Sequence, residues 1–216
     1  MSTLTLRKTQ IVETNLNGIY VTDGESLFFM TAEQDNMPLN PRENDCYCTI
    51  CYVRSRHLGS SKYDNDMDFA DSDDLNDYLA GLKDRGTEFV SVPLYVYVHS
   101  GITIRTGSFG DPWDSSCFGI AICTKEQVIN AFGNDTDWQQ HAQDIIKGEI
   151  ETCDKFLTGE TYVYSTYFYC KETKKWTLED ISGGFYSNDE DEMFSSYFGN
   201  NYRIIDESEV EPYMRS

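Results

Sequence analysis

The sequence predicts an α+β fold in a single domain, with a mostly antiparallel sheet and two consecutive helices packed on it at about residues 124–158. Short segments rich in β-branched and aromatic residues, bounded by turn residues, occupy both ends of the chain. Two capping-box sequences follow one another in the middle. Strands, then helices, then strands again is an order typical of α+β proteins.

The first 55 residues predict four strands. Each candidate is rich in β-branched, aromatic or Cys residues and is flanked by turn formers such as Asn17, Asp23 and Gly24. The predicted strands are residues 4–12, 18–22, 27–31 and 46–54. Between the last two, residues 33–45 are polar and contain Pro38 and Pro41, which favours a loop.

The next segment differs because it is acidic. Between residues 64 and 77 there is no Lys or Arg, and the aspartates are Asp64, Asp66, Asp68, Asp71, Asp73, Asp74 and Asp77. We expect an acidic loop and helix excursion from the domain at about residues 58–86. The helix is predicted over residues 75–83 from the spacing of its apolar residues, with Ser72 or Asp73 as its N-cap.

The middle of the chain predicts a hairpin and then the two helices. Residues 89–98 and 102–106 flank the tight turn at Ser100 and Gly101, and residues 118–123 have the composition of a buried strand. A capping box at residues 124–127 opens a short helix, and a second at residues 136–139 opens the longest helix, whose apolar stripe continues to Leu157.

The last part of the chain predicts a return to strands at residues 161–170, 176–178 and 184–186. Four tyrosines in the first of these change face midway along it, because their spacing shifts from even to odd. They are Tyr162, Tyr164, Tyr167 and Tyr169.

The excess of acidic over basic residues limits the kinds of partner that the protein can bind. There are 37 acidic and 17 basic residues, which gives a net charge of −20 on 216 residues. A charge of about 2 to 8 already keeps a small domain soluble, so the excess suggests a basic partner, hard metal ions or a high-salt environment. The 14% aromatic content excludes a disordered acidic tail, and the negative charge opposes direct binding to nucleic acid or anionic membranes.

Other features are consistent with a cytoplasmic protein. No apolar run approaches the roughly 20 residues that span a bilayer, and no signal-peptide pattern is present at the start. Cys46, Cys48 and Cys51 with His57 lack the second ligand pair of a structural zinc site, so we expect buried thiols there. We expect no cofactor and no metal.

Residues 92–103 read V-P-L-Y-V-Y-V-H-S-G-I-T, and the pattern continues with P-W-D-S at 112–115 and Gly119–Ile120. It extends through T-K-E at 124–126 and G-E-I-E at 148–151 to Asp154 and residues 157–160. This combination resembles a family of uncharacterised proteins from bacteriophages and plasmids, over the middle third to half of the chain. Two departures are Val98, where the family has Asp, and Asp111, where it has Cys.

The resemblance implies an origin on a mobile element and a place in the cytoplasm of a bacterial host cell. Small, very acidic phage proteins are often inhibitors of host defence, including anti-CRISPR and antirestriction proteins that act as DNA mimics. No activity comes with the family itself. The resemblance therefore adds a biological setting to the charge argument without assigning a catalytic residue.

The aspartates supply the predicted mechanism. On an extended chain Asp64, Asp66 and Asp68 repeat at about 6.6 Å, close to the rise of two nucleotides on one DNA strand. We therefore expect an acidic nucleic-acid mimic that occupies the basic surface of a host defence nuclease, such as a CRISPR effector or a restriction enzyme. The residues expected to contact this partner are Asp64, Asp66, Asp68, Asp71, Asp73, Asp74, Asp77, Asp144, Glu151, Asp189, Glu190, Asp191 and Glu192.

Several alternatives stay open. The Asp-rich segment could be an ordinary solvated loop, as could residues 189–192 and 206–211. A metal-dependent hydrolase or nucleotide-degrading protein would use Asp64 and Asp66, or His99 and Asp114, although an EF-hand is excluded because Phe69 stands where that loop needs Gly. A protein that sequesters a small defence messenger is a further alternative.

A nucleophilic site is disfavoured. His99 and Ser100 are adjacent, so on an extended chain they point to opposite faces, and Ser115 lies in an ordinary loop sequence without a nucleophile elbow. The simpler interpretation of His99 and Asp114 is a hairpin corner. Oligomeric state is left open by the sequence.

Overall fold

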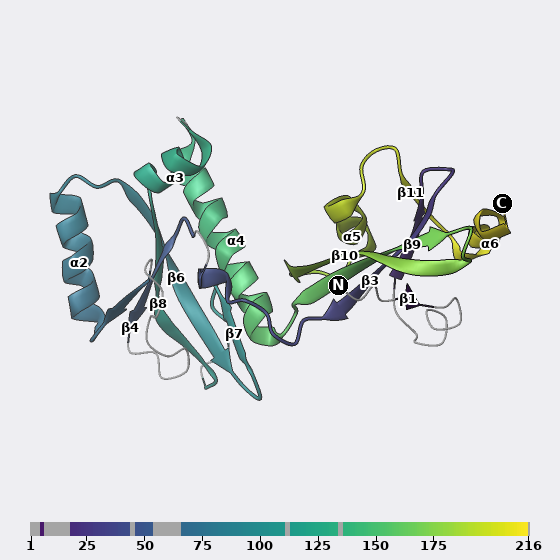
Figure 1. Cartoon of the computed structure of the whole chain (residues 1–216). Helices are drawn as coiled ribbons and strands as arrows, with labels where there is room; N and C mark the ends of the chain where they lie inside the picture. The colour runs from purple at the N-terminus through teal and green to yellow at the C-terminus, as the bar shows by residue number, and fades with distance from the viewer. Residues whose placement is uncertain are drawn as a thin grey trace. The chain divides into compact units, whose positions relative to one another are not determined.

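The computed structural model describes residues 5–6, 18–43, 46–53, 66–110, 113–133 and 136–215 (Figure 1). The chain divides into two compact units. The terminal unit is made of Met1–Pro38 and Gly159–Ser216, and the central unit is Leu39–Thr158. The predicted α+β class is confirmed, but two sheets replace the expected single sheet with its two helices, because each unit builds a sheet of its own.

The terminal unit contains a six-stranded sheet in the order β1-β10-β9-β3-β2-β11, in which all neighbours are antiparallel. Two short helices cover its two faces, α5 with Met193 on one and α6 with Val210 on the other. Its elements are β1 (Thr5–Leu6), β2 (Gly18–Thr22), β3 (Leu27–Gln34), β9 (Tyr162–Cys170), β10 (Lys175–Phe185), α5 (Glu190–Tyr197), β11 (Arg203–Ile205) and α6 (Glu207–Arg215).

Side chains that alternate along each strand point to opposite faces of this sheet and form a hydrophobic core on each face. Tyr162 and Tyr164 of β9 lie on the α5 side, whereas Tyr167 and Tyr169 lie on the α6 side. The predicted change of face is confirmed. It follows from the period of two along a strand, since Tyr167 is an odd number of positions, three, after Tyr164.

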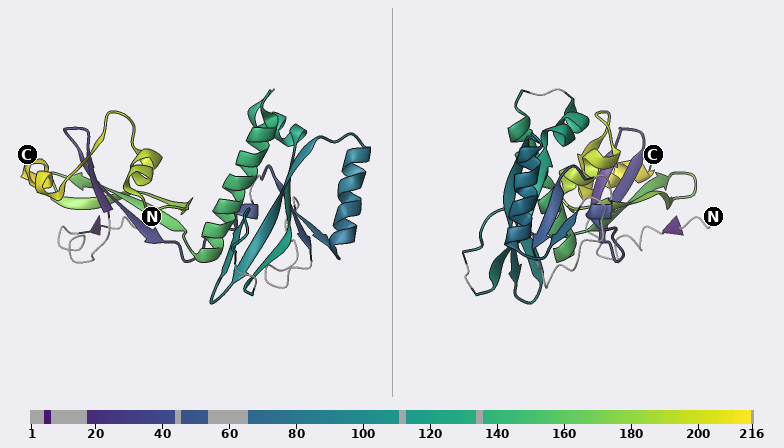
Figure 2. Two further views of the ribbon diagram at one scale, coloured as in Figure 1. Left: turned by 180° about the vertical axis from the view of Figure 1, so that it is seen from behind. Right: turned by 90° about the vertical axis from the view of Figure 1, so that its left-hand side faces the viewer.

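The central unit contains a five-stranded sheet in the order β5-β4-β8-β6-β7, with β4 and β5 parallel and the other neighbours antiparallel. α2 lies on one face and α4 on the other, as both views show (Figures 1 and 2). The elements are η1 (Pro41–Glu43), β4 (Thr49–Val53), β5 (Met67–Phe69), α2 (Ser72–Asp84), β6 (Phe89–Val98), β7 (Ile102–Arg105), β8 (Ser115–Thr124), α3 (Lys125–Phe132) and α4 (Trp138–Thr158).

The apolar stripe of α4 forms the larger core of this unit. Ala142, Ile146 and Ile150 are fully buried on it and pack with Leu94 and Val96 of β6. On the other face, Leu75 and Leu82 of α2 pack with Cys51 and Ile122. The sheet is therefore a middle layer between helices, which is why its strands are apolar on both sides.

Most elements lie where the sequence predicts them, with some corrections. β2 and β6 have the predicted bounds, and the capping box of α3 is formed by Thr124 and Gln127. The strands predicted at 176–178 and 184–186 are one strand, β10, interrupted by bulges. α5 and α6 were not predicted. Of the strand predicted at 4–12, only β1 lies within the described residues.

The described part of the acidic segment is integrated into the central unit. β5 pairs with β4, and α2 packs on the sheet, so it is not an excursion from the domain. Among the described residues, no helix is long and apolar enough to cross a membrane.

Candidate functional site

The Asp-rich segment is positioned by the start of α2. The side chain of Asp71 accepts hydrogen bonds from the backbone N–H groups of Asp73 and Asp74, both at 3.0 Å. Asp71 is therefore the N-cap, and the prediction of Ser72 or Asp73 was wrong by one or two residues. Because the N-terminal end of a helix is electropositive, this cap and the two aspartates after it stabilise the helix locally.

The outward side of α2 carries a row of carboxylates. Asp73, Asp77 and Asp84 follow one another at intervals of four and seven residues, opposite the buried Leu75 and Leu82. Asp74 lies beside them, and all four aspartates are exposed. We call these four residues the acidic face of α2. The sequence prediction did not include Asp84, although its spacing of seven residues from Asp77 places both on one face of a helix.

The acidic face is not neutralised within the described part of the chain. None of the ion pairs found there involves Asp73, Asp74 or Asp77. Asp68 is also exposed, on the short edge strand β5 that precedes α2. Asp73, Asp74 and Asp77 thus remain accessible to a partner.

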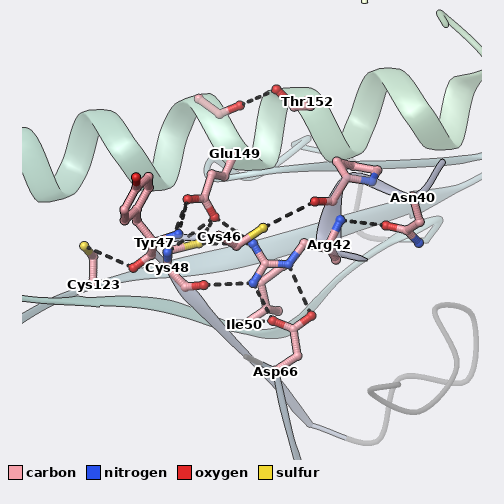
Figure 3. Close-up of polar contacts among 12 residues, drawn as sticks. Asn40, Arg42, Cys46, Tyr47, Cys48, Ile50, Asp66, Cys123, Glu149 and Thr152 are labelled. Atoms are coloured by element: carbon pink, nitrogen blue, oxygen red, sulfur yellow. Dashed lines mark hydrogen bonds and ion pairs between the residues drawn. The ribbon is translucent and has the colours of Figure 1, made fainter. Parts of the chain in front are cut away.

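Asp66 is a correction to the predicted row. Its side chain is 0% exposed, and its Oδ1 lies 2.5 Å from Nη2 of Arg42 (Figure 3). The same oxygen accepts a hydrogen bond from the backbone N–H of Ile50 at 3.1 Å. Asp64 lies outside the described residues. The predicted extended row of Asp64, Asp66 and Asp68 therefore does not form, because the middle carboxylate is buried against a guanidinium.

Arg42 connects Asp66 to α4. Its Nη1 lies 2.7 Å from Oε2 of Glu149, and its Nη2 donates to the backbone carbonyl of Cys48 at 2.8 Å (Figure 3). Burial by itself would lower the pKa of Arg42, but the hydrogen bonds and the charge of Asp66 outweigh it and raise that pKa above its ordinary value. The guanidinium remains charged and links η1, β4 and α4 in a hydrogen-bonded network.

Glu149 completes this network from the helix side. Its Oε1 accepts a hydrogen bond from the backbone N–H of Tyr47 at 2.7 Å, and its Oε2 accepts one from the thiol of Cys48 at 3.0 Å. These contacts are made by the two residues directly before β4. The arrangement joins α4 to the sheet and leaves the carboxylate only partly exposed, which favours a structural role.

The cysteines near this network are neutral thiols. Burial raises the pKa of Cys51 and Cys153 to about 12, and that of Cys46 and Cys123 to about 11. The prediction of buried thiols is confirmed for Cys48 and Cys51, whereas Cys46 is half-buried. His57 lies outside the described residues. No group of three His, Cys, Asp or Glu side chains within the described ranges is arranged to hold a metal ion.

The remaining predicted contact residues lie elsewhere. Asp144 and Glu151 are exposed on α4, which covers the face of the sheet opposite to α2. Within the central unit, the acidic residues of α2 and α4 therefore point to opposite sides and do not form one continuous row. A partner that contacts both sets of residues would have to reach both faces of the sheet.

The acidic stretch at 189–192 belongs to the terminal unit. Asp189 is the N-cap of α5 and accepts hydrogen bonds from the N–H groups of Asp191 and Glu192 at 3.0 and 3.2 Å. Glu190, Asp191 and Glu192 form the exposed first turn. As at the start of α2, carboxylates stand where the helix dipole favours them, so helix stability accounts for part of the negative charge.

His99 and Asp114 are brought together by the hairpin. Nδ1 of His99 lies 3.4 Å from Oδ2 of Asp114, and both side chains are exposed. Ser100 has a positive φ of 59°, and its hydroxyl donates to the carbonyl of His99 at 2.5 Å. The serine hydroxyl thus turns back to the backbone, and the structure supports a hairpin corner.

The residues that carry the phage-family resemblance fall almost entirely in the central unit. Residues 92–103 cover most of β6, the turn and the first half of β7, and Asp111 lies outside the described residues. Asp154 of α4 accepts hydrogen bonds from Oγ1 of Thr103 at 2.5 Å and from the N–H of Ile104 at 2.8 Å. Glu149 and Asp154 therefore both fasten α4 to the sheet. No family model matches the chain, and neither a curated protein nor a solved structure matches it.

Proposed function

We propose that the protein inhibits a bacterial defence protein that binds nucleic acid, such as a CRISPR effector or a restriction enzyme, by occupying its basic surface. The observation that carries this proposal is the acidic face of α2, on a chain of net charge −20. Lys and Arg side chains that normally hold phosphates would hold these carboxylates. The protein then acts as a stoichiometric competitor in the cytoplasm of a phage host, without binding nucleic acid itself.

The helix spaces its charges suitably for this role. Asp73 and Asp77 are four residues apart, which is about 6 Å along a helix axis at 1.5 Å per residue. Two nucleotides on one DNA strand rise by a similar distance, about 6.8 Å. The helix thus replaces the extended row that the sequence predicted, and it does so on a rigid element whose ends are capped.

Affinity in such a complex depends strongly on salt. Exposed carboxylates opposite Lys and Arg steer the encounter and raise the association rate, and ions screen this attraction over about 8 Å at physiological ionic strength. We therefore expect the dissociation constant to rise steeply between low and high salt. An affinity independent of salt would contradict electrostatic mimicry.

The decisive experiment compares two triple variants. D73N/D74N/D77N removes three charges from the acidic face of α2, whereas E126Q/D144N/E151Q removes three from exposed positions on α3 and α4. Each changes the net charge from −20 by three units to −17. Because the two variants match in total charge, only the location of the lost charge differs between them.

Both variants and the unchanged protein are used as baits in a bacterial host extract, and captured proteins are identified by mass spectrometry. We expect a nucleic-acid-binding complex on the unchanged protein and on E126Q/D144N/E151Q, and its loss from D73N/D74N/D77N. The purified complex must then bind its nucleic acid less tightly when the protein is added. Equal capture by both variants would move the site away from α2.

A further inference from the structure

The β6–β7 hairpin presents aromatic rings on the same side of the five-stranded sheet as α2. Leu94, Val96 and Val98 of β6 pack toward α4, so the alternating residues Tyr95 and Tyr97 point to the opposite face. That face is the one on which α2 packs, through Phe89 of the same strand. α2 covers the β4 and β8 half of it, and neither tyrosine belongs to the α2 core.

Tyr95, Tyr97 and Phe109 are half-buried, and the ring of Tyr97 has two aromatic neighbours. Tyr97 lies 5.5 Å from Phe109 and 6.2 Å from His99 between ring centres. Trp113 follows in the next loop, directly before the aspartate that pairs with His99, and it is 92% exposed. We call Tyr95, Tyr97 and Phe109 the aromatic face, and Trp113 lies next to it in the sequence of the β7–β8 loop.

The segment of the sequence that carries these rings has few charged residues. Residues 89–124 contain three charged residues in 36, namely Arg105, Asp111 and Asp114, whereas 25% of the whole chain is charged. Aromatic enrichment with depletion of charge is the composition of the buried centre of protein interfaces. Half-buried rings that lie together beside an exposed loop tryptophan mark an interaction site more often than isolated apolar side chains do.

The acidic end of α2 lies at the same end of the sheet as the hairpin. β4 and β6 both pair antiparallel with β8, so they run in the same direction. β5 is parallel to β4 and therefore also runs in the same direction as β6. β5 leads directly into the first turn of α2, and β6 leads into the hairpin turn. The start of α2 is therefore at the hairpin end of the sheet (Figure 1), and Asp73 and Asp74 belong to its first turn.

We infer that the aromatic face binds an arginine-rich segment of the basic partner, whose neighbouring cations pair with the aspartates at the start of α2. This inference rests on the proposed function and names the chemistry of its contact. Guanidinium groups stack on aromatic rings and also pair with carboxylates, whereas ammonium groups do not stack as planes. Arg105 already shows this mode, with its Cζ 3.8 Å from the centre of the Phe109 ring.

Two synthetic peptides of equal charge test the inference: nine arginines and nine lysines. Trp113 is the reporter, because the other two tryptophans, Trp138 and Trp176, are 7% and 2% exposed. We expect the arginine peptide to change the tryptophan emission and to bind about tenfold more tightly than the lysine peptide. Equal affinities for the two peptides would overturn a role for the rings.

Ring-removing variants locate the contact. Y95A/Y97A is expected to weaken the arginine peptide about tenfold and the lysine peptide little, while Y95F/Y97F keeps both rings and binds like the unchanged protein. Y197A removes a ring that is 42% exposed on α5 and serves as the control. If circular dichroism shows that Y95A/Y97A is unfolded, the test uses Y95F/Y97F instead. This variant keeps both rings, so loss of its preference for the arginine peptide would contradict stacking on the rings.

The acidic and aromatic variants separate this inference from the proposed function. D73N/D74N/D77N is expected to weaken both peptides to the same extent, since it removes charge and leaves the rings. If the natural partner is lost from D73N/D74N/D77N but retained by Y95A/Y97A, the proposed function holds and the aromatic contact is wrong. If both variants retain the partner, both proposals fail.

Discussion

Asp66 and Arg42 form a buried ion pair, with 2.5 Å between Oδ1 and Nη2 and side chains that are 0% and 4% exposed. The pair joins the start of β5 to the loop before β4, and Glu149 extends it to α4. A carboxylate near the start of the most acidic stretch of the chain thus contributes to the core of the central unit instead of its surface.

Removing one partner of this pair is expected to be costly. D66N leaves the Arg42 guanidinium buried with its main counter-charge lost, which typically costs about 3 to 5 kcal/mol. D73N changes an exposed aspartate on the same segment and is expected to stay within about 0.5 kcal/mol. Urea denaturation measures both. Equal stabilities would show that the pair contributes nothing to folding.

Gly119 permits β4 and β8 to approach. A Cβ at this position would lie 2.0 Å from the carbonyl oxygen of Cys51, which belongs to the backbone and cannot move aside cheaply. G119A is therefore expected to lose more than about 2 kcal/mol of unfolding free energy, as overpacked core positions do. G148A lies in α4 with no atom within 4 Å of its added Cβ, and it is expected to gain about 0.5 to 1 kcal/mol. A tolerated G119A would contradict the close strand spacing.

Asp154 holds the edge strand β7 through the N–H of Ile104 and the hydroxyl of Thr103. D154A leaves both donors without this acceptor, and about 1 to 3 kcal/mol of stability is expected to be lost. Amide exchange at Ile104 should accelerate more than exchange at buried Ile146 in α4. Uniform acceleration across the unit would indicate global unfolding and not release of β7.

Stability is expected to fall at alkaline pH because of the buried thiols. Burial raises the pKa of Cys51 and Cys153 to about 12 and that of Cys46 and Cys123 to about 11, whereas a thiol in the unfolded chain has a pKa of about 8.5. Above that value the unfolded chain loses protons first, so the unfolding free energy decreases as pH rises toward 11 to 12 and is unaffected below about 8.

Cysteine variants test this alkaline loss. C51A and C153A are each expected to reduce the slope of stability against pH above about 8.5, by up to about 1.4 kcal/mol per pH unit for each thiol. The exposed Cys117, replaced in C117S, is the control. An unchanged slope in both C51A and C153A would assign the alkaline loss to other groups, with Tyr52 next, because burial raises its pKa as well.

Local sequence was sufficient for the elements that carry their own periodicity. β6 and α4 were predictable because apolar residues recur at intervals of two in one and of three to four in the other, and Thr124 with Gln127 marks the start of α3. α5 and α6 were missed because each has a single buried apolar residue, Met193 and Val210, and acidic residues dominate its first turn.

By itself, then, the sequence determined the α+β composition, the large negative charge and the alternating faces of the strands, since each depends on residue type and local spacing. Only the tertiary structure decided which carboxylates face the solvent. Asp66 is buried because Arg42, 24 residues earlier, meets it, and Glu149 reaches Arg42 from 107 residues away. Contacts at such separations depend on how strands and helices pack, which no local pattern of charge specifies.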